Sequence, residues 1–414
     1  MRIVHIVGGN LNSGSGRGAL WLHQAQLTMG LDSHLFTLND SDKVQKLENV
    51  YSFPHGRFDK LYYNFNRRIK NYWISKIYTN KTNVIFSTGL DGVNFLSHPV
   101  YKSADIVHLH WINSFASIDT ISKIEKPIVW TLRDMWPFTG GCHISLGCEK
   151  FKDSCGNCPQ LNGLISYDLS TYILKLKKSK FSSKIVFVGI SNWISGLAKS
   201  SSLLKNYRIE TISNNIDTNR FVKIEKEIAR TKVNINLDKK IILIGAEVLT
   251  EPWKGFDYFL DSIRYLKSKN LHFLFFGELD LSILEKMEIE YTYLGQIRDD
   301  LILNNIYSSA DVFIAPSIYE SFGKTIVESM ASGTPVVCFD ATGPKDIVEH
   351  YLTGYKAKPF DCADLATGID WVLGLGTREK EKISQNCIER AKKLFDSGII
   401  AAQYYNLYKE LNLN

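Results

Sequence analysis

The sequence predicts an α/β protein that consists of two doubly wound parallel sheets, one after the other. Its 414 residues exceed what one ordinary core holds and suit two domains. Short runs rich in Val, Ile and Phe alternate with helix-like segments along both halves, and these segments are long enough for the crossovers that a parallel sheet requires. A polar, turn-rich stretch at 212–221 interrupts the alternation. We therefore expect the domain boundary just after it.

The first domain is predicted over residues 1–222, followed by a linker at 223–238. The linker assignment depends on the high charge and few large apolar side chains between Glu225 and Asp238. In the first domain, five apolar runs have the length and the β-branched and aromatic content of buried strands. They are Arg2–Val7, Ser33–Leu38, Ile106–Leu109, Pro127–Leu132 and Lys184–Ile190.

The second domain is predicted over residues 239–390, where the alternation restarts. Doubly wound sheets bind ligands at the carboxyl ends of their strands, so we expect two Rossmann-like domains that face each other across a ligand cleft. Residues 391–414 belong to a helix-like segment that the sequence does not assign to either lobe. The expected strands are Lys240–Gly245, His272–Gly277, Thr292–Leu294, Val312–Ala315 and Pro335–Phe339, and the expected helices are Gly255–Lys267, Leu301–Ser309, Lys324–Ser332 and Ala363–Leu373.

The composition is that of a soluble globular protein. Hydrophobic residues make up 44% and charged residues 22% of the chain, which excludes a disordered protein. The sequence contains no run of about 18 uncharged apolar residues, which excludes a transmembrane helix. The apolar start at Met1–Gly9 is shorter than a signal peptide and is expected to form a buried strand. These features predict a cytoplasmic protein with reduced cysteines.

The segment 316–337 has the pattern of a diphosphate-binding site. It follows an expected strand, forms a loop and enters a helix near Gly323. A helix N-terminus presents N–H groups and a partial positive charge to a phosphate, and glycine permits a close backbone approach. Glu320 in the loop and Glu328 in the helix can accept hydrogen bonds from two hydroxyl groups of one elongated ligand. The alternative is a chance pair of surface glutamates.

This segment resembles the E-x7-E signature of retaining GT-B glycosyltransferases of family 4. The two glutamates here are Glu320 and Glu328, and Gly-Thr-Pro-Val-Val follows at 333–337. The resemblance implies that Glu320 is catalytic and contacts the donor sugar, and that Glu328 binds the ribose of the nucleotide. It also implies that the sugar and the diphosphate are bound by Ser321, Phe322, Gly323, Lys324 and Thr325.

Other matches extend the resemblance over nearly the whole chain. Lys254 follows the first strand of the second domain, where the family places a lysine on the donor phosphates. The stretch 212–221 resembles the family's P-N-G-I-D-x-x-x-F linker, with Ser213 and Asn215 in place of Pro and Gly. Many relatives have an arginine near the phosphate-binding lysine, and this sequence has Ala246 and Glu247 there instead. The candidates for the missing positive charge are Arg17, Arg298, Lys254 and Lys324.

His110 lies at the end of an expected strand and should face the ligand cleft. The resemblance implies a catalytic residue near the donor sugar, and the alternative is a core histidine with satisfied hydrogen bonds. Thr131-Leu-Arg133-Asp134 matches a family segment that commonly reads T-x-H-D, with Arg133 in place of the histidine. The family's chemistry is metal-independent and retaining, with front-face attack by the acceptor hydroxyl. No D-x-D segment in a strand-end context contradicts this expectation.

A glycine-rich loop follows the first expected strand. Gly14 and Gly16 lie in this loop, before an expected helix at Leu20–Met29, and we predict that they bind the donor. The loop also fits a dinucleotide site, but the strict G-x-G-x-x-G pattern is missing and no clear acidic residue ends the second strand. A nicotinamide cofactor is therefore not expected.

Four of the seven cysteines cluster with the spacing C-x5-C-x6-C-x2-C, beside His143. Four thiolates could bind tetrahedral zinc as a structural clip, while simple reduced thiols and, less expected, disulfides are the alternatives. The chemistry itself needs no cofactor. The candidate ligands are Cys142, Cys148, Cys155 and Cys158.

A basic and aromatic stretch at 56–81 has apolar residues at helical spacing. This pattern suits either a helix at an anionic membrane surface, on the inner face of the plasma membrane, or a surface helix that packs on the first domain. A polyprenyl-linked acceptor would explain membrane docking. The apolar side chains are Phe58, Leu61, Tyr62, Phe65, Ile69, Tyr72, Trp73 and Ile77, and the residues assigned to a membrane or acceptor patch are Arg67, Arg68, Lys70 and Trp73.

The sequence therefore predicts a glycosyltransferase that uses a UDP- or GDP-linked sugar and a saccharide or lipid-linked saccharide acceptor. The stretch from Asp134 to Gln160 resembles a family 4 subgroup in bacterial exopolysaccharide and O-antigen assembly. Three alternatives remain: a sugar-nucleotide epimerase on the same fold, an inactive scaffold, and a nucleic-acid-binding protein that uses the basic stretch with a zinc clip.

Overall fold

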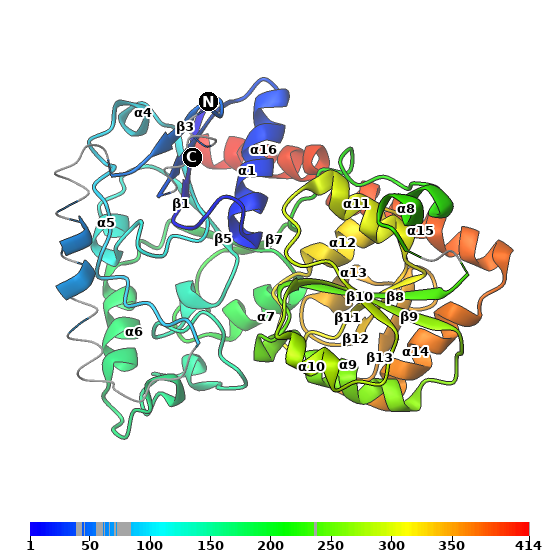
Figure 1. Ribbon diagram of the computed structural model, residues 1–414. Helices are drawn as coiled ribbons and strands as arrows, with labels where there is room; N and C mark the ends of the chain where they lie inside the picture. The colour runs from blue at the N-terminus through cyan, green and yellow to red at the C-terminus, as the bar shows by residue number, and fades with distance from the viewer. Residues whose placement is uncertain are drawn as a thin grey trace. The chain divides into compact units, whose positions relative to one another are not determined.

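The computed structural model describes residues 1–38, 44, 46–54, 61, 63–65, 67–69, 72, 84–235 and 238–413. The chain divides into two compact units, one of Met1–Ile212 with Ala401–Asn414 and one of Ser213–Ile400. Each unit contains one parallel sheet with helices packed around it (Figure 1). The prediction of two Rossmann-like α/β domains is confirmed.

The first unit contains a seven-stranded sheet in the order β3-β2-β1-β4-β5-β6-β7, with all neighbours parallel. The five expected strands are present to within two residues at either end. Sequence patterns missed β3 and β7, because each has three residues and none of them is buried. The strands are β1 (Arg2–Val7), β2 (Asp32–Thr37), β3 (Val50–Ser52), β4 (Ile106–Leu109), β5 (Ile128–Leu132), β6 (Val186–Gly189) and β7 (Ile209–Thr211).

The helices of the first unit include the end of the chain. The C-terminal helix α16 lies beside α1 (Figure 1), and Gln26 of α1 donates a hydrogen bond to Tyr408 of α16 at 3.3 Å. The helical prediction for the C-terminal segment is confirmed, and its unassigned end belongs with the first unit. The α-helices are α1 (Gly14–Thr28), α4 (Pro99–Lys102), α5 (Ile118–Ser122), α6 (Leu169–Lys180), α7 (Asn192–Ser200) and α16 (Ser397–Asn412), with short 3-10 turns at Trp136–Phe138, Lys150–Lys152 and Pro159–Leu161.

The second unit contains a six-stranded parallel sheet in the order β10-β9-β8-β11-β12-β13. All five expected strands are present, and the sequence patterns missed the four-residue β13, which begins at a glycine. The strands are β8 (Lys240–Val248), β9 (Leu271–Glu278), β10 (Tyr291–Tyr293), β11 (Val312–Ala315), β12 (Val336–Phe339) and β13 (Gly354–Ala357).

The second unit also contains helices on both sides of the sequence positions of these strands. They are α8 (Lys226–Lys232), α9 (Phe256–Ser262), α10 (Leu281–Glu285), α11 (Asp300–Ser309), α12 (Lys324–Ala331), α13 (Pro344–Ile347), α14 (Cys362–Gly374) and α15 (Thr377–Phe395), with 3-10 turns at Pro252–Lys254 and Ile263–Tyr265.

The predicted linker at 223–238 differs from the structure. It contains α8, which packs within the second unit, and the first unit ends at Ile212. Arg230 of α8 is 5% exposed and donates to a carboxylate oxygen of Asp311 at 2.8 Å, and Lys226 pairs with the other oxygen at 2.5 Å. Two of the charges that suggested a linker, Lys226 and Arg230, therefore pair with Asp311 within the second unit.

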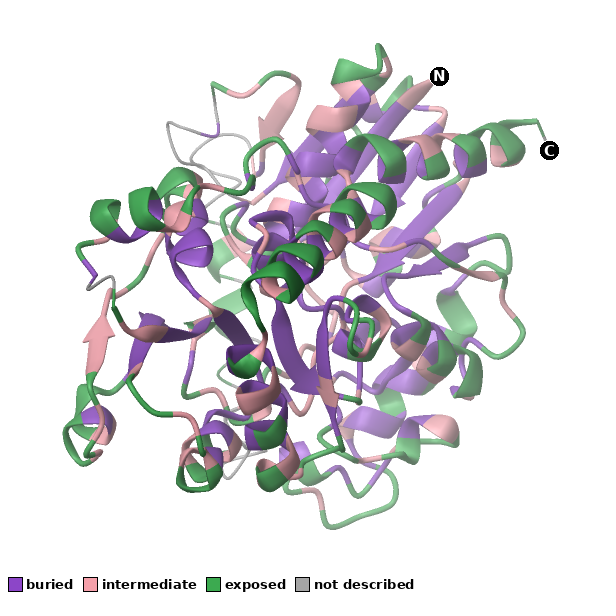
Figure 2. Ribbon diagram, turned by 90° about the vertical axis from the view of Figure 1, so that its right-hand side faces the viewer, coloured by how far each residue is buried: buried purple, intermediate pink, exposed green. Residues whose placement is uncertain are grey.

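The strands of the two sheets supply a large part of the buried core. The central strands are buried along their length, while the outer faces of the helices are exposed (Figure 2). This is the pattern of sheets covered on both faces, as parallel connections require. Among the described residues, no helix combines the length and the apolar character needed to cross a bilayer.

Candidate active site

Two loops at the carboxyl ends of β8 and β11 are fixed to each other. Ile318, after β11, donates its N–H to the carbonyl of Trp253 at 2.9 Å. Gly255 has a φ of 67°, and a Cβ there would lie 2.0 Å from the carbonyl oxygen of Pro316. Only glycine permits this approach, which brings Lys254 to the β11–α12 loop.

Lys254 and Glu320 form an ion pair in the second unit. The Lys254 Nζ lies 2.5 Å from a carboxylate oxygen of Glu320, with the two side chains 26% and 23% exposed. The lysine expected to bind phosphate and the glutamate expected to bind sugar are thus adjacent. Because the pair is partly open to solvent, an anionic ligand can compete for the lysine and leave the carboxylate to accept hydroxyl groups.

The N-terminus of α12 begins three residues after Glu320. Its N-cap is Gly323, which has a φ of 110° and provides no side-chain cap. The peptide dipoles of the helix give this end a partial positive charge. Gly343, which precedes α13, donates its N–H to the carbonyl of Glu320 at 2.8 Å and ties the loop to this segment. This arrangement provides an anion site at a helix end beside Lys254.

The other predicted residues of the segment have different environments. Phe322 is buried and its ring packs on Phe395 at 5.6 Å, so its side chain serves the core. Glu328 is 2% exposed and accepts a hydrogen bond from the Tyr307 hydroxyl at 3.0 Å. The alternative of two chance surface glutamates is therefore wrong for Glu328. Ser321, Lys324 and Thr325 are half-buried in the loop and the first turn of α12.

The position of the missing arginine is acidic. Burial raises the pKa of Glu251, Lys254 lowers it, and Glu247 and Glu278 raise it further. Of the proposed substitutes, Arg298 is exposed and donates to Gln296 at 3.3 Å. Arg17 belongs to the first unit and stacks on Trp21 at 4.6 Å. These contacts do not assign a replacement for the arginine.

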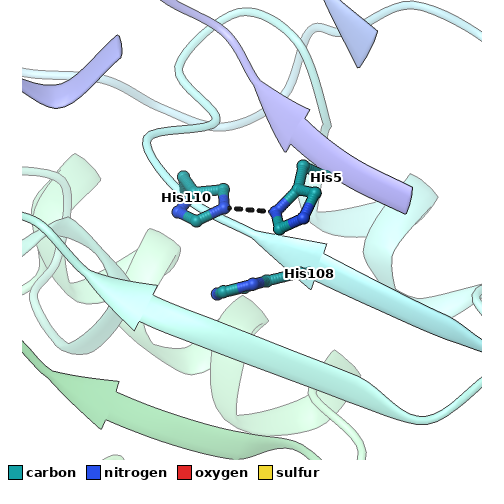
Figure 3. A group of neighbouring side chains, drawn as sticks. All are labelled: His5, His108 and His110. Atoms are coloured by element: carbon teal, nitrogen blue, oxygen red, sulfur yellow. Dashed lines mark hydrogen bonds between the residues drawn. The ribbon is translucent and has the colours of Figure 1, made fainter. Parts of the chain in front are cut away.

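The first unit contains a buried histidine cluster of His5, His108 and His110 (Figure 3). His5 lies on β1, His108 lies on the neighbouring strand β4, and His110 directly follows β4. His5 and His110 are hydrogen-bonded at 2.9 Å, and the rings of His108 and His110 lie 4.0 Å apart. Arg133, after β5, lies over the cluster with its guanidinium 3.3 Å from Nδ1 of His110.

The direction of these hydrogen bonds follows from Arg133. A guanidinium only donates, so Nδ1 of His110 accepts and its proton resides on Nε2 when the ring is neutral. That Nε2–H donates to Nδ1 of His5, and the Nε2–H of His5 then donates to Gln26 at 2.8 Å. One arginine therefore sets the tautomers of two histidines.

Burial keeps the cluster neutral. It lowers the pKa of His5 to about 3, with His23 adding to the effect, and it lowers the pKa of His110 well below the usual value, with His108 and Arg133 adding. Burial also lowers the pKa of His108. The ligand nitrogens lie within 4.8 Å of one another, as a metal site requires. However, the ring nitrogens already have partners and the guanidinium of the half-buried Arg133 contacts His110, so the residues do not fit a cation.

His110 is buried, with 2% of the residue exposed. Its side-chain nitrogens contact Arg133 and His5, its N–H donates to the Ile6 carbonyl at 3.1 Å, and its carbonyl accepts from Trp130 at 3.3 Å. This is the environment of a satisfied core histidine. A catalytic role for His110 stays a prediction, and it requires a ligand to replace one of these hydrogen-bond partners.

The glycine-rich loop is shorter than expected, because α1 already begins at Gly14. Gly14 is exposed, with open space where a Cβ would project. Gly16 is buried, and a Cβ would lie 2.1 Å from the carbonyl of Asn10. Packing thus explains Gly16, and donor binding by either glycine stays a prediction.

A second polar chain in the first unit was missed by sequence reasoning. Nδ1 of His143 lies 2.5 Å from a carboxylate oxygen of Asp134, and its Nε2 lies 2.7 Å from the Ser87 hydroxyl. The indole nitrogen of Trp111 lies 3.1 Å from the same Nδ1, which cannot accept from the indole while it donates to Asp134. The signal was present in Asp134 and His143, nine residues apart, but the partner Ser87 is 56 residues away.

The predicted membrane patch is described in part. Arg67 and Arg68 are exposed, and Lys70 and Trp73 lie outside the described residues, as do Phe58, Tyr62 and Ile77. The Tyr63 hydroxyl donates to the carbonyl of Ser114 at 2.8 Å and ties this stretch to the first unit. Four large apolar side chains on the stretch are exposed, namely Leu61, Phe65, Ile69 and Tyr72.

Comparison with solved structures supports the fold. A structure of Anabaena HepE in complex with UDP-glucose is similar over 99% of this chain and 100% of that chain, with a TM-score of 0.65 and 16% identity. At this identity the likeness concerns the fold alone.

Two curated relatives match part of the chain. An uncharacterized glycosyltransferase of Methanocaldococcus jannaschii is 30% identical over 194 residues, which is 45% of this chain and 48% of the relative. The N,N'-diacetylbacillosaminyl-diphospho-undecaprenol alpha-1,3-N-acetylgalactosaminyltransferase of Campylobacter jejuni is 28% identical over 249 residues, which is 57% of this chain and 62% of the relative. The chain thus spans about half to three-fifths of the length of these relatives.

One family model covers most of the second unit. Residues 225–394 match the model described as glycosyl transferases group 1. This range includes Lys254, Glu320, the N-terminus of α12 and Glu328. The second unit therefore carries the sequence pattern of the group 1 glycosyl transferases.

Proposed function

We propose that this protein is a glycosyltransferase that moves a sugar from a nucleotide diphosphate to a saccharide or lipid-linked saccharide. The observation that carries the proposal is the Lys254–Glu320 pair beside the N-terminus of α12. A diphosphate requires cationic groups and N–H donors, and a sugar requires a carboxylate next to them. The two loops after β8 and β11 together provide all three.

The donor occupies the second unit in this proposal. The diphosphate binds Lys254 and the first turn of α12, Glu320 accepts from sugar hydroxyls, and Glu328 binds the ribose by exchanging its Tyr307 contact. The group 1 match over 225–394 supports a nucleotide sugar as donor. UDP-sugars are the first donors to test, because HepE, which has the same fold, binds UDP-glucose.

The transfer proceeds with retention and without a metal ion. The acceptor hydroxyl attacks the anomeric carbon on the face that the phosphate leaves, the C–O bond to the diphosphate breaks, and the departing phosphate takes the hydroxyl proton. Lys254 and the helix end stabilise the charge that develops on the diphosphate. Glu320 orients the sugar and stabilises its positive charge.

The acceptor is proposed to be lipid-linked, in the assembly of a bacterial surface polysaccharide. The Campylobacter relative is named for an undecaprenol-linked acceptor. Leu61, Phe65 and Tyr72 are 66%, 63% and 56% exposed, with Arg67 and Arg68 between them. Exposed apolar side chains at helical spacing among cations suit an anionic membrane surface.

A thermal-shift panel of UDP- and GDP-sugars tests donor binding. We expect one nucleotide sugar to raise the melting temperature, because a ligand of the folded state stabilises it, and Lys254→Met to abolish the shift. Lys223→Met is the matched control, since Lys223 forms an exposed ion pair with Glu381 elsewhere in the second unit. A panel without any shift would overturn the proposed donor site.

A product assay tests the reaction. Incubation of the best donor with lipid-linked saccharides, without added divalent cation, should yield a product with the donor's anomeric configuration by NMR. Inverted product would overturn retention. Conversion of the donor without any acceptor would indicate an epimerase instead.

A liposome assay tests the membrane surface. The protein should sediment with anionic vesicles at low salt and be released by high salt, because the attraction between cations and headgroups is screened. Leu61→Ser with Phe65→Ser should weaken sedimentation, while Leu164→Ser, at a 91% exposed leucine of the same unit, should leave it unchanged. Equal binding by all variants would contradict the assignment.

A further inference from the structure

Four cysteines of the first unit line one small cavity. Cys142, Cys148, Cys155 and Cys158 surround about 20 Å³ of free space, roughly the room of one water molecule. All four are free thiols. The loop that carries them, 142–158, contains a single turn of 3-10 helix, so regular secondary structure does little to hold it.

The sulfur atoms of this cavity are aligned with N–H donors. The N–H of Gly140 donates to the sulfur of Cys155, and the N–H groups of Gln160 and Leu161 donate to the sulfur of Cys158. Burial is the larger influence and raises the pKa of both thiols, to about 11 for Cys155, and these bonds offset only part of that effect. Because Gln160 and Leu161 lie two and three residues after Cys158, these bonds require the chain to turn around the Cys158 sulfur.

A buried lysine lies near the cavity. Lys177 is fully buried, and its ammonium donates to the carbonyl oxygens of Trp136 and Thr139, the latter at 3.0 Å. Burial lowers the pKa of Lys177 to about 7, and Cys142, Asp134 and Cys155 raise it in turn. Four thiolates on a divalent ion carry a net charge of two minus, which a buried lysine partly offsets.

We propose that Cys142, Cys148, Cys155 and Cys158 bind one zinc ion that holds the 142–158 loop. Four thiolates are a preferred ligand set of structural zinc. The size of the cavity favours a single ion over an iron–sulfur cluster, which would need more room. The proposal does not depend on the transfer reaction.

Zinc requires the four side chains to close inward. Among the described residues, the histidine cluster is the group of potential metal ligands whose atoms all lie within 4.8 Å, so no three of these sulfurs are that close. Zinc–sulfur bonds of about 2.3 Å need closer sulfurs. Cys148 can move, because its neighbours Gly147 and Glu149 are exposed and a Cβ on Gly147 would meet nothing within 4 Å.

The zinc site would also position His143. This residue follows Cys142 and bonds Asp134 and Ser87 from the same loop. Closing the loop on an ion fixes the backbone at Cys142 and with it the ring of His143. A structural zinc here thus supports the polar chain next to Trp111.

Metal analysis of the full chain, purified without chelator, tests the proposal. We expect close to one zinc per chain, and after exchange with Co²⁺ the near-ultraviolet charge-transfer bands of cobalt bound to thiolates. Neither readout needs activity or a variant. Iron with acid-labile sulfide, two disulfides, or seven reactive thiols without metal would each overturn the zinc site.

Cysteine variants locate the ion. Cys155→Ser and Cys158→Ser should each lower the zinc content at least several-fold, while Cys362→Ser, a half-buried cysteine of the second unit, should retain it. If a variant fails to fold, the cobalt spectrum of the native protein still decides. Full zinc content in both cluster variants would overturn the assignment.

Discussion

The β11–α12 loop of the second unit differs from the histidine cluster of the first in burial and in charge. In this loop Glu320 forms a partly exposed ion pair with Lys254, which comes from the loop after β8, beside a helix end. The cluster holds neutral, buried rings whose nitrogens are all hydrogen-bonded, to another histidine or to neighbouring side chains. A charged ligand can open the first arrangement at low cost, whereas the second resists both ligands and protons. The comparison suggests that binding belongs to the loop and rigidity to the cluster.

The largest expected effect is at Glu320. Glu320→Gln should lower turnover by about two to three orders of magnitude, because the sugar loses a preorganised charge. Glu381→Gln is the matched control, since Glu381 also pairs with a lysine of the second unit. Steady-state kinetics with circular dichroism measures both rate and fold. A Glu320→Gln enzyme at the wild-type rate would remove this residue from the mechanism.

Acid should destabilise the first unit more than the second. Burial lowers the pKa of His5 to about 3 and that of His23 to about 4, below the usual 6.5. The unfolded chain thus binds protons first, so this stability is complete above about pH 6.5 and falls toward pH 4, by about 1.4 kcal/mol per pH unit for each histidine.

Hydrogen exchange, read by mass spectrometry and corrected for intrinsic rates, resolves the two units. Protection should fall between pH 7 and pH 5 in β1 and β4 before it falls in β8 and β11. An equal loss in both sheets would mean that the buried histidines do not govern acid stability.

The smallest effect sharpens the assignment of Arg133. Arg133→Met should cost about 1–3 kcal/mol, because Nδ1 of His110 loses a buried donor. It should also shift the tautomer of His110, seen by ¹⁵N–¹H correlation of the imidazole. Arg133→Lys keeps a donor and should retain the Nε2–H form. Unchanged imidazole spectra in Arg133→Met would show that other contacts set the tautomer.

The same contrast explains what the sequence could predict. The loop is a local feature, in which strand, loop and helix follow within one segment, so spacing revealed Glu320 and Glu328. The histidine cluster is non-local, since His5 and His110 are 105 residues apart, and His108 bonds Tyr408 at a separation of 300. No local pattern carries that information.

Errors in the fold prediction have similar causes. Apolar periodicity identified the buried strands, but β3, β7 and β13 are too short for it. Charge content suggested a linker where α8 pairs with Asp311. A contact with a distant residue decided each outcome.

The position of α16 has a consequence for the order of folding. Tyr404 and Tyr408 complete the hydrogen bonds of Thr131, His108 and Gln26, yet Ser213–Ile400 must be synthesised before them. At about 5–20 residues per second, that takes roughly 10–40 s. During this time Thr131, His108 and Gln26 lack the hydroxyl partners that α16 provides, and the second unit can fold before the first unit is complete.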